Sequence, residues 1–124
     1  MTDNYKVITL CGSTRFKDDF LRVQKELTLD GNIVISVGLF GYSGDDEAWT
    51  EGTKRMLDDM HLAKIDMADE IFVVNPGGYV GDSTSCKIAY AIKKGKAIRS
   101  LVPIHLDRFK EEEGFSPSCP IRRE

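Results

Sequence analysis

Short runs of apolar residues alternate along the chain with longer segments in which apolar side chains recur every three or four positions. The short runs are rich in Val and Ile, which is typical of parallel strands buried on both faces. They comprise residues 6–10, 33–39, 70–75 and 97–102. The longer segments have the spacing of amphipathic helices. They comprise residues 15–29, 47–67 and 85–94, so the pattern predicts strands and helices in strict alternation.

Residues that favour turns separate these segments and set their ends. Gly31 follows the first helix, Gly95 is placed to stop the third, and Gly52 predicts a shorter second helix. The segment 40–46 combines glycines with acidic side chains, so we expect an exposed loop there that could serve as a lid. Residues 76–81 contain a proline and three glycines, which predicts a sharp turn before the third helix.

Strands that alternate with helices form a parallel sheet, because each crossover is right-handed and each helix must cover one face. The predicted fold class is therefore α/β. We expect a Rossmann-like parallel sheet in the flavodoxin-like order 2-1-3-4, with at least four strands and helices on both faces. A chain of 124 residues fits a single domain, residues 1–124. Its core spans about residues 6–102, and the tail, residues 103–124, has no clear period.

Two loops follow neighbouring strands of the predicted sheet and carry its least ordinary sequences. They are residues 11–15, after the first strand, and residues 76–84, after the third. In the order 2-1-3-4 the crossovers from these two strands leave on opposite faces, which opens a crevice above their carboxyl ends. Ligands of open α/β sheets bind in such crevices. We therefore expect a binding site where the two loops meet.

The first loop offers hydrogen-bond donors beside a helix start, where unpaired backbone N–H groups favour an oxyanion. Gly12 and the hydroxyls of Ser13 and Thr14 fit this role, and Arg15 adds a positive charge. Simple helix capping explains the same Ser-Thr pair equally well. The loop is a candidate for holding a phosphate or a sugar hydroxyl.

The second loop combines flexible backbone with polar side chains. Gly77 and Gly78 allow the backbone to approach a ligand closely. Asp82 and Ser83 place a carboxylate and a hydroxyl beside the first turn of the third helix. Three aromatic side chains either stack on a base or pack within the protein: Tyr42, Trp49 and Tyr79.

Composition and charge exclude several classes of partner. Lys and Arg number 17 against 20 Asp and Glu, and the net charge of -3 gives no attraction to nucleic acid or to anionic membranes. No apolar run is long enough to cross a bilayer and the chain start lacks a secretory pattern, so we expect a cytoplasmic protein without membrane contact. The three cysteines lack paired metal-ligand spacing, which favours reduced thiols and no metal.

Two common nucleotide motifs are missing from the sequence. GxGxxG does not follow the first strand, and the phosphate loop GxxxxGK[ST] does not occur. Ordinary dinucleotide binding and nucleoside triphosphate hydrolysis therefore lose support, and a smaller nucleoside ligand remains.

Several short motifs lie on the predicted strands and helices in the order found in a known family. They are Cys11-Gly12-Ser13-Thr14-Arg15, residues 68–74 (ADEIFVV), Asp82-Ser83-Thr84, residues 88–91 (IAYA) and Gly95-Lys96. Together they resemble the nucleoside 2-deoxyribosyltransferase-like superfamily, which includes 2'-deoxynucleoside 5'-phosphate N-hydrolases, over about residues 6–102. The resemblance implies a homo-oligomer that cleaves or exchanges the bond between a base and deoxyribose through a nucleophilic glutamate.

Two residues depart from the family pattern at the catalytic centre. Lys87 stands where the resemblance places the nucleophilic glutamate, and His61 aligns with a second carboxylate, eight residues before Asp69. Lysine is a poor substitute, because its charge opposes an oxocarbenium-like carbon. Three interpretations stay open. Asp82 is the working carboxylate while Lys87 or His61 protonates the base; Lys87 binds a 5'-phosphate without turnover; or Lys87 is an exposed, ion-paired lysine.

With this resemblance, the sequence predicts a domain that binds a nucleoside or a nucleoside 5'-monophosphate, with no metal and no cofactor. The predicted catalytic residues are Asp82, Lys87 and His61. The predicted substrate-binding residues are Gly12, Ser13, Thr14, Arg15, Gly77, Gly78, Tyr79 and Ser83. An active protein would be an N-glycosidase or a deoxyribosyltransferase. The alternative is a non-catalytic nucleotide-binding or regulatory module of the same fold.

Overall fold

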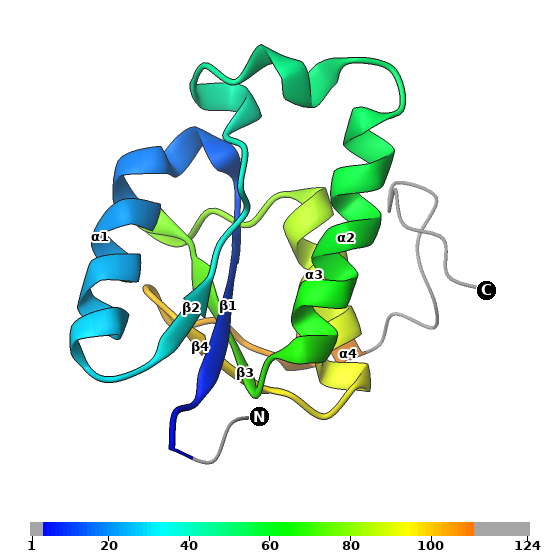
Figure 1. Ribbon diagram of the computed structural model, residues 1–124. Coiled ribbons are helices and arrows are strands. Elements are labelled where there is room, and N and C mark those ends of the chain that lie inside the picture. Colours follow the sequence, from blue (N-terminus) through cyan, green and yellow to red (C-terminus); the bar gives the residue numbers. More distant parts are fainter. Residues whose placement is uncertain (1–3, 111–124) are drawn as a thin grey trace.

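The computed structural model describes residues 4–110, in which strands and helices alternate (Figure 1). The strands are β1 (Val7–Gly12), β2 (Ile33–Ile35), β3 (Glu70–Val74) and β4 (Ala97–Ser100). The α-helices are α1 (Lys17–Leu29), α2 (Thr53–Met67), α3 (Asp82–Lys93) and the short α4 (Asp107–Lys110). Short 3-10 turns lie between them: η1 (Thr14–Phe16), η2 (Gly41–Ser43), η3 (Asp46–Trp49) and η4 (Pro76–Gly78).

The strands form one parallel sheet in the order β2-β1-β3-β4. The central strands β1 and β3 pair from Ile8 with Glu70 to Gly12 with Val74. The predicted α/β fold class and the flavodoxin-like strand order are therefore confirmed. Since β1 leads to an outer strand on one side and β3 to an outer strand on the other, their carboxyl ends mark the switch point of the sheet.

Helices cover both faces of the sheet, as predicted. α1 lies on one face, and α2, α3 and α4 lie on the other (Figure 1). Phe20 of α1 belongs to a buried cluster with Leu10 of β1. Leu62 of α2 and Ile88 of α3 belong to a second cluster with Val73 of β3. Each such side chain contributes about 1.5–3 kcal/mol on full burial, so the two clusters fix the central strands from both sides.

All four strands differ from the prediction at their carboxyl ends. β3 (Glu70–Val74) ends one residue early and β4 (Ala97–Ser100) ends two residues early. β1 continues through Gly12, which pairs with Val74, so two residues expected in the following loop belong to the strand. β2 is shorter than predicted and spans only Ile33–Ile35. The next carbonyl, that of Ser36, accepts a hydrogen bond from Lys64 Nζ at 2.8 Å. A side chain thus satisfies a group that a longer strand would have paired with its neighbour.

The segment before α2 is more ordered than an exposed loop. It forms η2 and η3, and Phe40 is buried with its ring 5.4 Å from that of Phe20. The expectation of a fully exposed loop at 40–46 is therefore wrong at its first residues. α2 begins at Thr53, directly after Gly52, whose φ of 86° explains the shortened helix.

Helix α3 begins earlier than predicted. Asp82, expected in the cap, is its first residue, and Gly81 is the N-cap. Gly95, with a φ of 75°, follows the C-cap as expected. Helix α4 lies in the tail, where no element was expected, and residues 111–124 lie outside the described residues.

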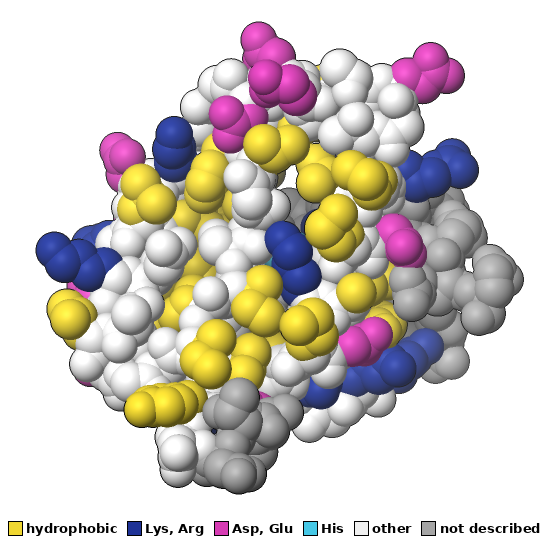
Figure 2. Space-filling view, in the orientation of Figure 1, with side chains coloured by type: hydrophobic (Ala, Val, Ile, Leu, Met, Phe, Trp, Pro, Cys, Tyr) yellow, Lys and Arg dark blue, Asp and Glu magenta, His cyan; other side chains and the backbone are white. Residues whose placement is uncertain are grey.

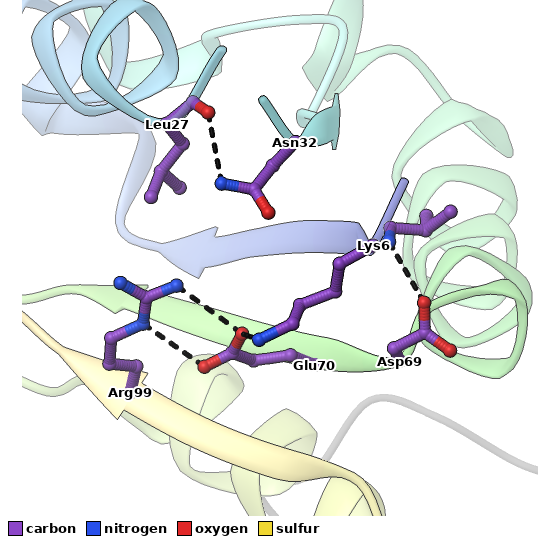
Figure 3. A network of polar contacts seen from close by, with 7 residues as sticks. Lys6, Leu27, Asn32, Asp69, Glu70 and Arg99 are labelled. Atoms are coloured by element: carbon purple, nitrogen blue, oxygen red, sulfur yellow. Dashed lines mark hydrogen bonds and ion pairs between the residues drawn. The ribbon is translucent and has the colours of Figure 1, made fainter. Parts of the chain in front are cut away.

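Polar contacts tie the strands together at their amino ends (Figure 3). Glu70 of β3 accepts hydrogen bonds from Lys6 Nζ at 3.2 Å and from Arg99 Nε of β4 at 3.0 Å. Asp69 accepts from the backbone N–H of Val7 at 2.9 Å. Burial raises the pKa of Glu70, but hydrogen bonds and charge from Arg99 and Lys6 outweigh it, so the pKa is lowered. A charged carboxylate therefore links three neighbouring segments.

The structure also bears on the expectations about membrane contact and about the cysteines. Among the described residues, no helix is both long enough and apolar enough to pass through a membrane. Cys86 of α3 is disulfide-bonded, which corrects the expectation of a reduced thiol at this position. Cys11 of β1 is a free, buried thiol.

Candidate functional site

A cavity of about 300 Å³ lies at the carboxyl ends of β1 and β3. Its wall comes from the β1–α1 connection, from residues between 37 and 49, from α2, and from residues 79–87 leading into α3. The volume is at the lower end of the roughly 300–1,000 Å³ range of small-molecule sites. The two loops singled out in the sequence thus meet at one cavity, at the switch point of the sheet.

Every predicted site residue except Gly77 and Gly78 lines this cavity. Those that line it are Gly12, Ser13, Thr14, Arg15, His61, Tyr79, Asp82, Ser83 and Lys87. Gly77 and Gly78 form η4 instead, with φ values of 68° and 86°. Their positive φ turns the chain, which brings the next residue to the cavity wall.

Gly12 lets the first loop leave β1 close to β3. A Cβ atom added there would lie 2.6 Å from the carbonyl oxygen of Val74, and the φ of Gly12 is 156°. Any other residue would force the two central strands apart at the cavity floor. The requirement for glycine at this position is therefore steric.

The loop after Gly12 is held by its own side chains and by a cation–aromatic stack. Ser13 Oγ accepts hydrogen bonds from the backbone N–H of Arg15 at 3.3 Å and from its Nε at 3.0 Å. The Arg15 guanidinium lies over the ring of Tyr42 at 4.9 Å and over that of Tyr79 at 5.1 Å. Ser13 caps η1, as the interpretation of simple helix capping predicted. Arg15 connects the two loops at the edge of the cavity.

Segment 40–50 folds over the first loop. The backbone N–H of Tyr42 donates to Thr14 Oγ1 at 3.1 Å, and Ser43 Oγ donates to the carbonyl of Thr14 at 2.8 Å. Trp49 Nε1 donates to the carbonyl of Gly41 at 3.1 Å. The segment thus occupies the position expected of a lid, with the rings of Tyr42 and Trp49 on the cavity wall.

Charged side chains from α2 and α3 form the opposite part of the wall. Lys54 Nζ donates to Asp58 Oδ2 at 2.9 Å, and Lys87 Nζ lies 3.4 Å from Asp58 Oδ1. Lys87 Nζ also donates to Ser83 Oγ at 3.2 Å. The side chain of Lys87 is only 13% exposed, so the interpretation of an exposed lysine is wrong, whereas the ion pair that it predicted is present.

His61 and Cys11 form a buried pair behind these charges. Cys11 Sγ lies 3.5 Å from His61 Nε2. Burial and the charges of Lys87 and Lys64 hold the pKa of His61 well below 6.5, although a hydrogen bond with the Leu10 backbone opposes them. Burial raises the pKa of Cys11 to about 12, against the influence of Lys87. Both groups are uncharged at neutral pH, so they do not form a reactive thiolate–imidazolium pair.

The sequence interpretation missed Lys54 and Asp58. Neither residue follows a strand, and the amphipathic pattern of α2 gives no reason to single out one charged position. The available signal was their spacing: Asp58 is four residues after Lys54 and three before His61, which places all three on one side of a helix. Within residues 4–110, no group of three or more His, Cys, Asp or Glu side chains is placed to hold a metal ion.

Comparisons with known proteins give no relatives. No protein-family model matches the chain, and searches of curated proteins and of solved structures find nothing similar to it. The family resemblance of the motifs therefore stays a prediction. The function has to be inferred from the cavity.

Proposed function

We propose that the cavity binds a nucleoside or a nucleoside 5'-monophosphate. The observation that carries this proposal is the meeting of residues 12–15 and residues 79–87 at one cavity, at the switch point of a parallel sheet. Nucleotides bind doubly wound sheets at this point, where loops from both halves can surround them. The modest volume suits a ligand with one base and one sugar better than a dinucleotide.

Aromatic side chains supply the surface that a base requires. Tyr42, Trp49 and Tyr79 all reach the cavity wall, and each remains 44% to 61% exposed. Stacking of a base on such a ring is worth about 1–3 kcal/mol and tolerates different bases. Arg15, which lies over the two tyrosine rings, can stack on the base or yield its place to it.

Polar groups supply contacts for the sugar and for a phosphate. Ser13, Thr14 and Arg15 offer hydroxyls and a guanidinium at one side, and Asp82 and Ser83 offer a carboxylate and a hydroxyl at the start of α3. A carboxylate accepts hydrogen bonds from sugar hydroxyls, and a guanidinium suits a phosphate. The cavity therefore carries complementary groups for each part of the ligand.

Cleavage or transfer at the N-glycosidic bond is the second candidate. Two carboxylates, Asp58 and Asp82, share the cavity with Lys87, so the groups for glycosidic chemistry are available even though Lys87 replaces a glutamate. Because His61 is neutral, a proton for the leaving base would come from Lys87. Without cleavage, the same cavity would serve a non-catalytic nucleotide-binding or regulatory module.

Calorimetric titration with the four common deoxynucleosides and their 5'-monophosphates tests binding. We expect saturable binding that Tyr79→Ala weakens by about tenfold, since it removes a stacking surface. Tyr5→Ala is the matched control, because Tyr5 is 53% exposed and outside the cavity wall. Absence of binding at millimolar ligand, or equal losses in both variants, would contradict the proposal.

Chromatography of the same mixtures for free base tests the second candidate. We expect an active protein to release base, and Asp82→Asn to abolish the release. Asp59→Asn removes a neighbouring exposed carboxylate of α2 that does not line the cavity, and it should leave the rate unchanged. Binding without any release of base would favour the non-catalytic module.

The resemblance also implies a homo-oligomer, and the charge and hydropathy of the sequence predict the other partners and the location. We expect a homo-oligomer in the cytoplasm that binds small molecules and neither nucleic acid nor membranes. Sedimentation velocity measures the first of these expectations directly, and a monomer over the whole accessible concentration range would contradict it.

A further inference from the structure

Two cations and one carboxylate of α2 and α3 form a charged cluster on the cavity wall. Two ammonium groups, those of Lys54 and Lys87, share one carboxylate, that of Asp58, at 2.9 and 3.4 Å. One positive charge of the three groups is therefore left without a partner among them. Over the whole wall, Arg15 adds a cation and Asp82 an anion, so the excess of one positive charge remains.

Burial strengthens the electrostatic effect of this unmatched positive charge. The side chains of Lys87 and Asp58 are only 13% and 10% exposed, so water screens them poorly. Burial is the first cause of the lowered pKa values of His61 and Lys64, and the charge of Lys87 is the second. The charge of Lys87 thus acts on two neighbouring side chains in addition to the effect of their burial.

Acidic side chains outside the cluster also lie on the outer side of the wall. Figure 2 shows acidic side chains along the outer side of the segment before α2, where Asp46 and Glu47 are exposed, and hydrophobic side chains over β2 and α2. The cluster of Lys54, Lys87 and Asp58 keeps one unmatched positive charge beside the cavity, and this charge favours an anionic ligand group.

We propose that Lys54, Lys87 and Ser83, arranged around Asp58, form an anion subsite that takes a phosphate monoester. Two ammonium groups and a hydroxyl, from different positions on α2 and α3, are available as donors to the several oxygens of a phosphate. No arginine belongs to this cluster, so an anion there meets point charges of the kind that bind phosphate. Asp58 holds Lys87 in place and, by repulsion, limits the affinity for the anion.

The subsite rests on the proposed function for the nucleoside part of the ligand and deepens it. The phosphate lies at Lys54, Lys87 and Ser83, which leaves Arg15 for the base, and a phosphate group can bind there whether or not a base follows. The subsite would make the cavity prefer phosphorylated ligands over free nucleosides. It also assigns a binding role to Lys87 that does not depend on glycosidic chemistry.

Titration of the full chain with inorganic phosphate and with ribose 5-phosphate, followed by amide NMR shifts, tests the subsite. We expect Lys87→Met to weaken both by about tenfold or more, because it removes a charged donor. Lys25→Met is the matched control with the same change of net charge on exposed α1, and it should bind like the parent protein. Asp58→Asn should bind phosphate more tightly, the opposite of a simple loss of structure.

Circular dichroism identifies variants that do not fold. If Lys87→Met is one of them, Lys54→Met becomes the variant that decides. Equal phosphate affinity in the cavity variant and in Lys25→Met, or no binding by the parent protein, would overturn the subsite. Tight nucleoside binding without phosphate binding would refute the subsite alone. Phosphate binding at Lys87 with no gain from an attached nucleoside would refute the proposed function alone.

Discussion

Individual buried ionisable side chains contribute separately to the pH dependence of the unfolding free energy. His61 is 4% exposed and neutral, whereas an unfolded chain would restore its ordinary pKa of 6.5. Below pH 6.5 the unfolded state therefore binds a proton that the folded state does not, and stability falls as the pH falls. The groups that face His61 are Cys11, Lys87 and Lys64, and neither lysine can compensate an added positive charge.

The buried, neutral His61 makes the effect of His61→Asn on the pH dependence of stability testable. The parent protein should lose up to about 1.4 kcal/mol of unfolding free energy per pH unit below 6.5 through this residue. The His61→Asn variant should be less stable at pH 7. Below pH 6.5 its unfolding free energy should fall less steeply with falling pH than that of the parent protein. Urea unfolding at pH 5, 6 and 7 measures it, with exposed His105→Asn as the control. An unchanged slope in His61→Asn would rule the explanation out.

Glu70 acts in a different pH window. Its pKa in the folded state is lowered from 4.5, so its stabilisation is present above pH 4.5 and is lost as the pH falls through the folded value. Glu70→Gln removes the partner of two cations that are 50% and 46% exposed and can return to water. We expect a loss of about 1–3 kcal/mol at pH 7, measured by urea unfolding.

Glu26 provides the control for Glu70. It is 62% exposed and lies 3.8 Å from Arg22 on α1, so Glu26→Gln should change stability by less than about 0.5 kcal/mol. Similar losses in the two variants would mean that the bridge at the amino ends of the strands does not stabilise the sheet.

At the scale of elements, the hydrophobic pattern predicted the strands and helices well and their ends poorly. The short run 33–39 is apolar apart from Ser36 and Gly38, yet β2 stops at Ile35. The reason lies far away in the sequence: Lys64, on α2, donates a hydrogen bond to the next carbonyl, that of Ser36. Phe40 likewise looks like a loop residue beside glycines, but its ring fills a space beside Phe20 that only the folded chain creates.

The segment between β2 and α2 should be the least stable part around the cavity. Its link to the first loop consists of two hydrogen bonds to Thr14, at 3.1 and 2.8 Å, and of the stack of Arg15 on Tyr42. Thr14→Val removes the acceptor for the Tyr42 amide, and we expect exchange of that amide to accelerate about five- to tenfold, since one hydrogen bond is worth about 1 kcal/mol. Amide hydrogen exchange by NMR measures this.

Thr28→Val is the control for Thr14→Val. Its hydroxyl donates to the carbonyl of Gln24 within α1, away from the cavity. Exchange at Tyr42 should not change in this variant. Equal exchange rates at Tyr42 in both variants would show that the segment is held by its aromatic contacts alone.

At the scale of the whole molecule, the topology predicted the location of the cavity but not all of its chemistry. The order of the strands is enough to bring residues 12–15 and 79–87 together, because both follow central strands. Lys54 and Asp58 reach the same cavity from α2. Their spacing places them on one side of that helix with His61, but no pattern in the sequence shows that this side faces the cavity.

Ligand binding should stabilise the whole fold. A ligand that binds only the folded state adds about 2.7 kcal/mol at a hundred times its dissociation constant. We therefore expect the melting temperature to rise with the concentration of a deoxynucleoside 5'-monophosphate, and to rise less in Lys87→Met. Thermal unfolding with sodium chloride at equal ionic strength is the control. A melting temperature independent of nucleotide concentration would contradict binding.

The strands are joined by Glu70 and Asp69 at one end of the sheet, and the side chains of the cavity gather at the other. This separation makes the molecule a practical starting point for protein engineering. A library randomised at Tyr42, Trp49 and Tyr79 would alter the recognition surface while the bonds that hold the scaffold remain intact. Selection from such a library could yield receptors for new metabolites without a parallel search for compensating mutations.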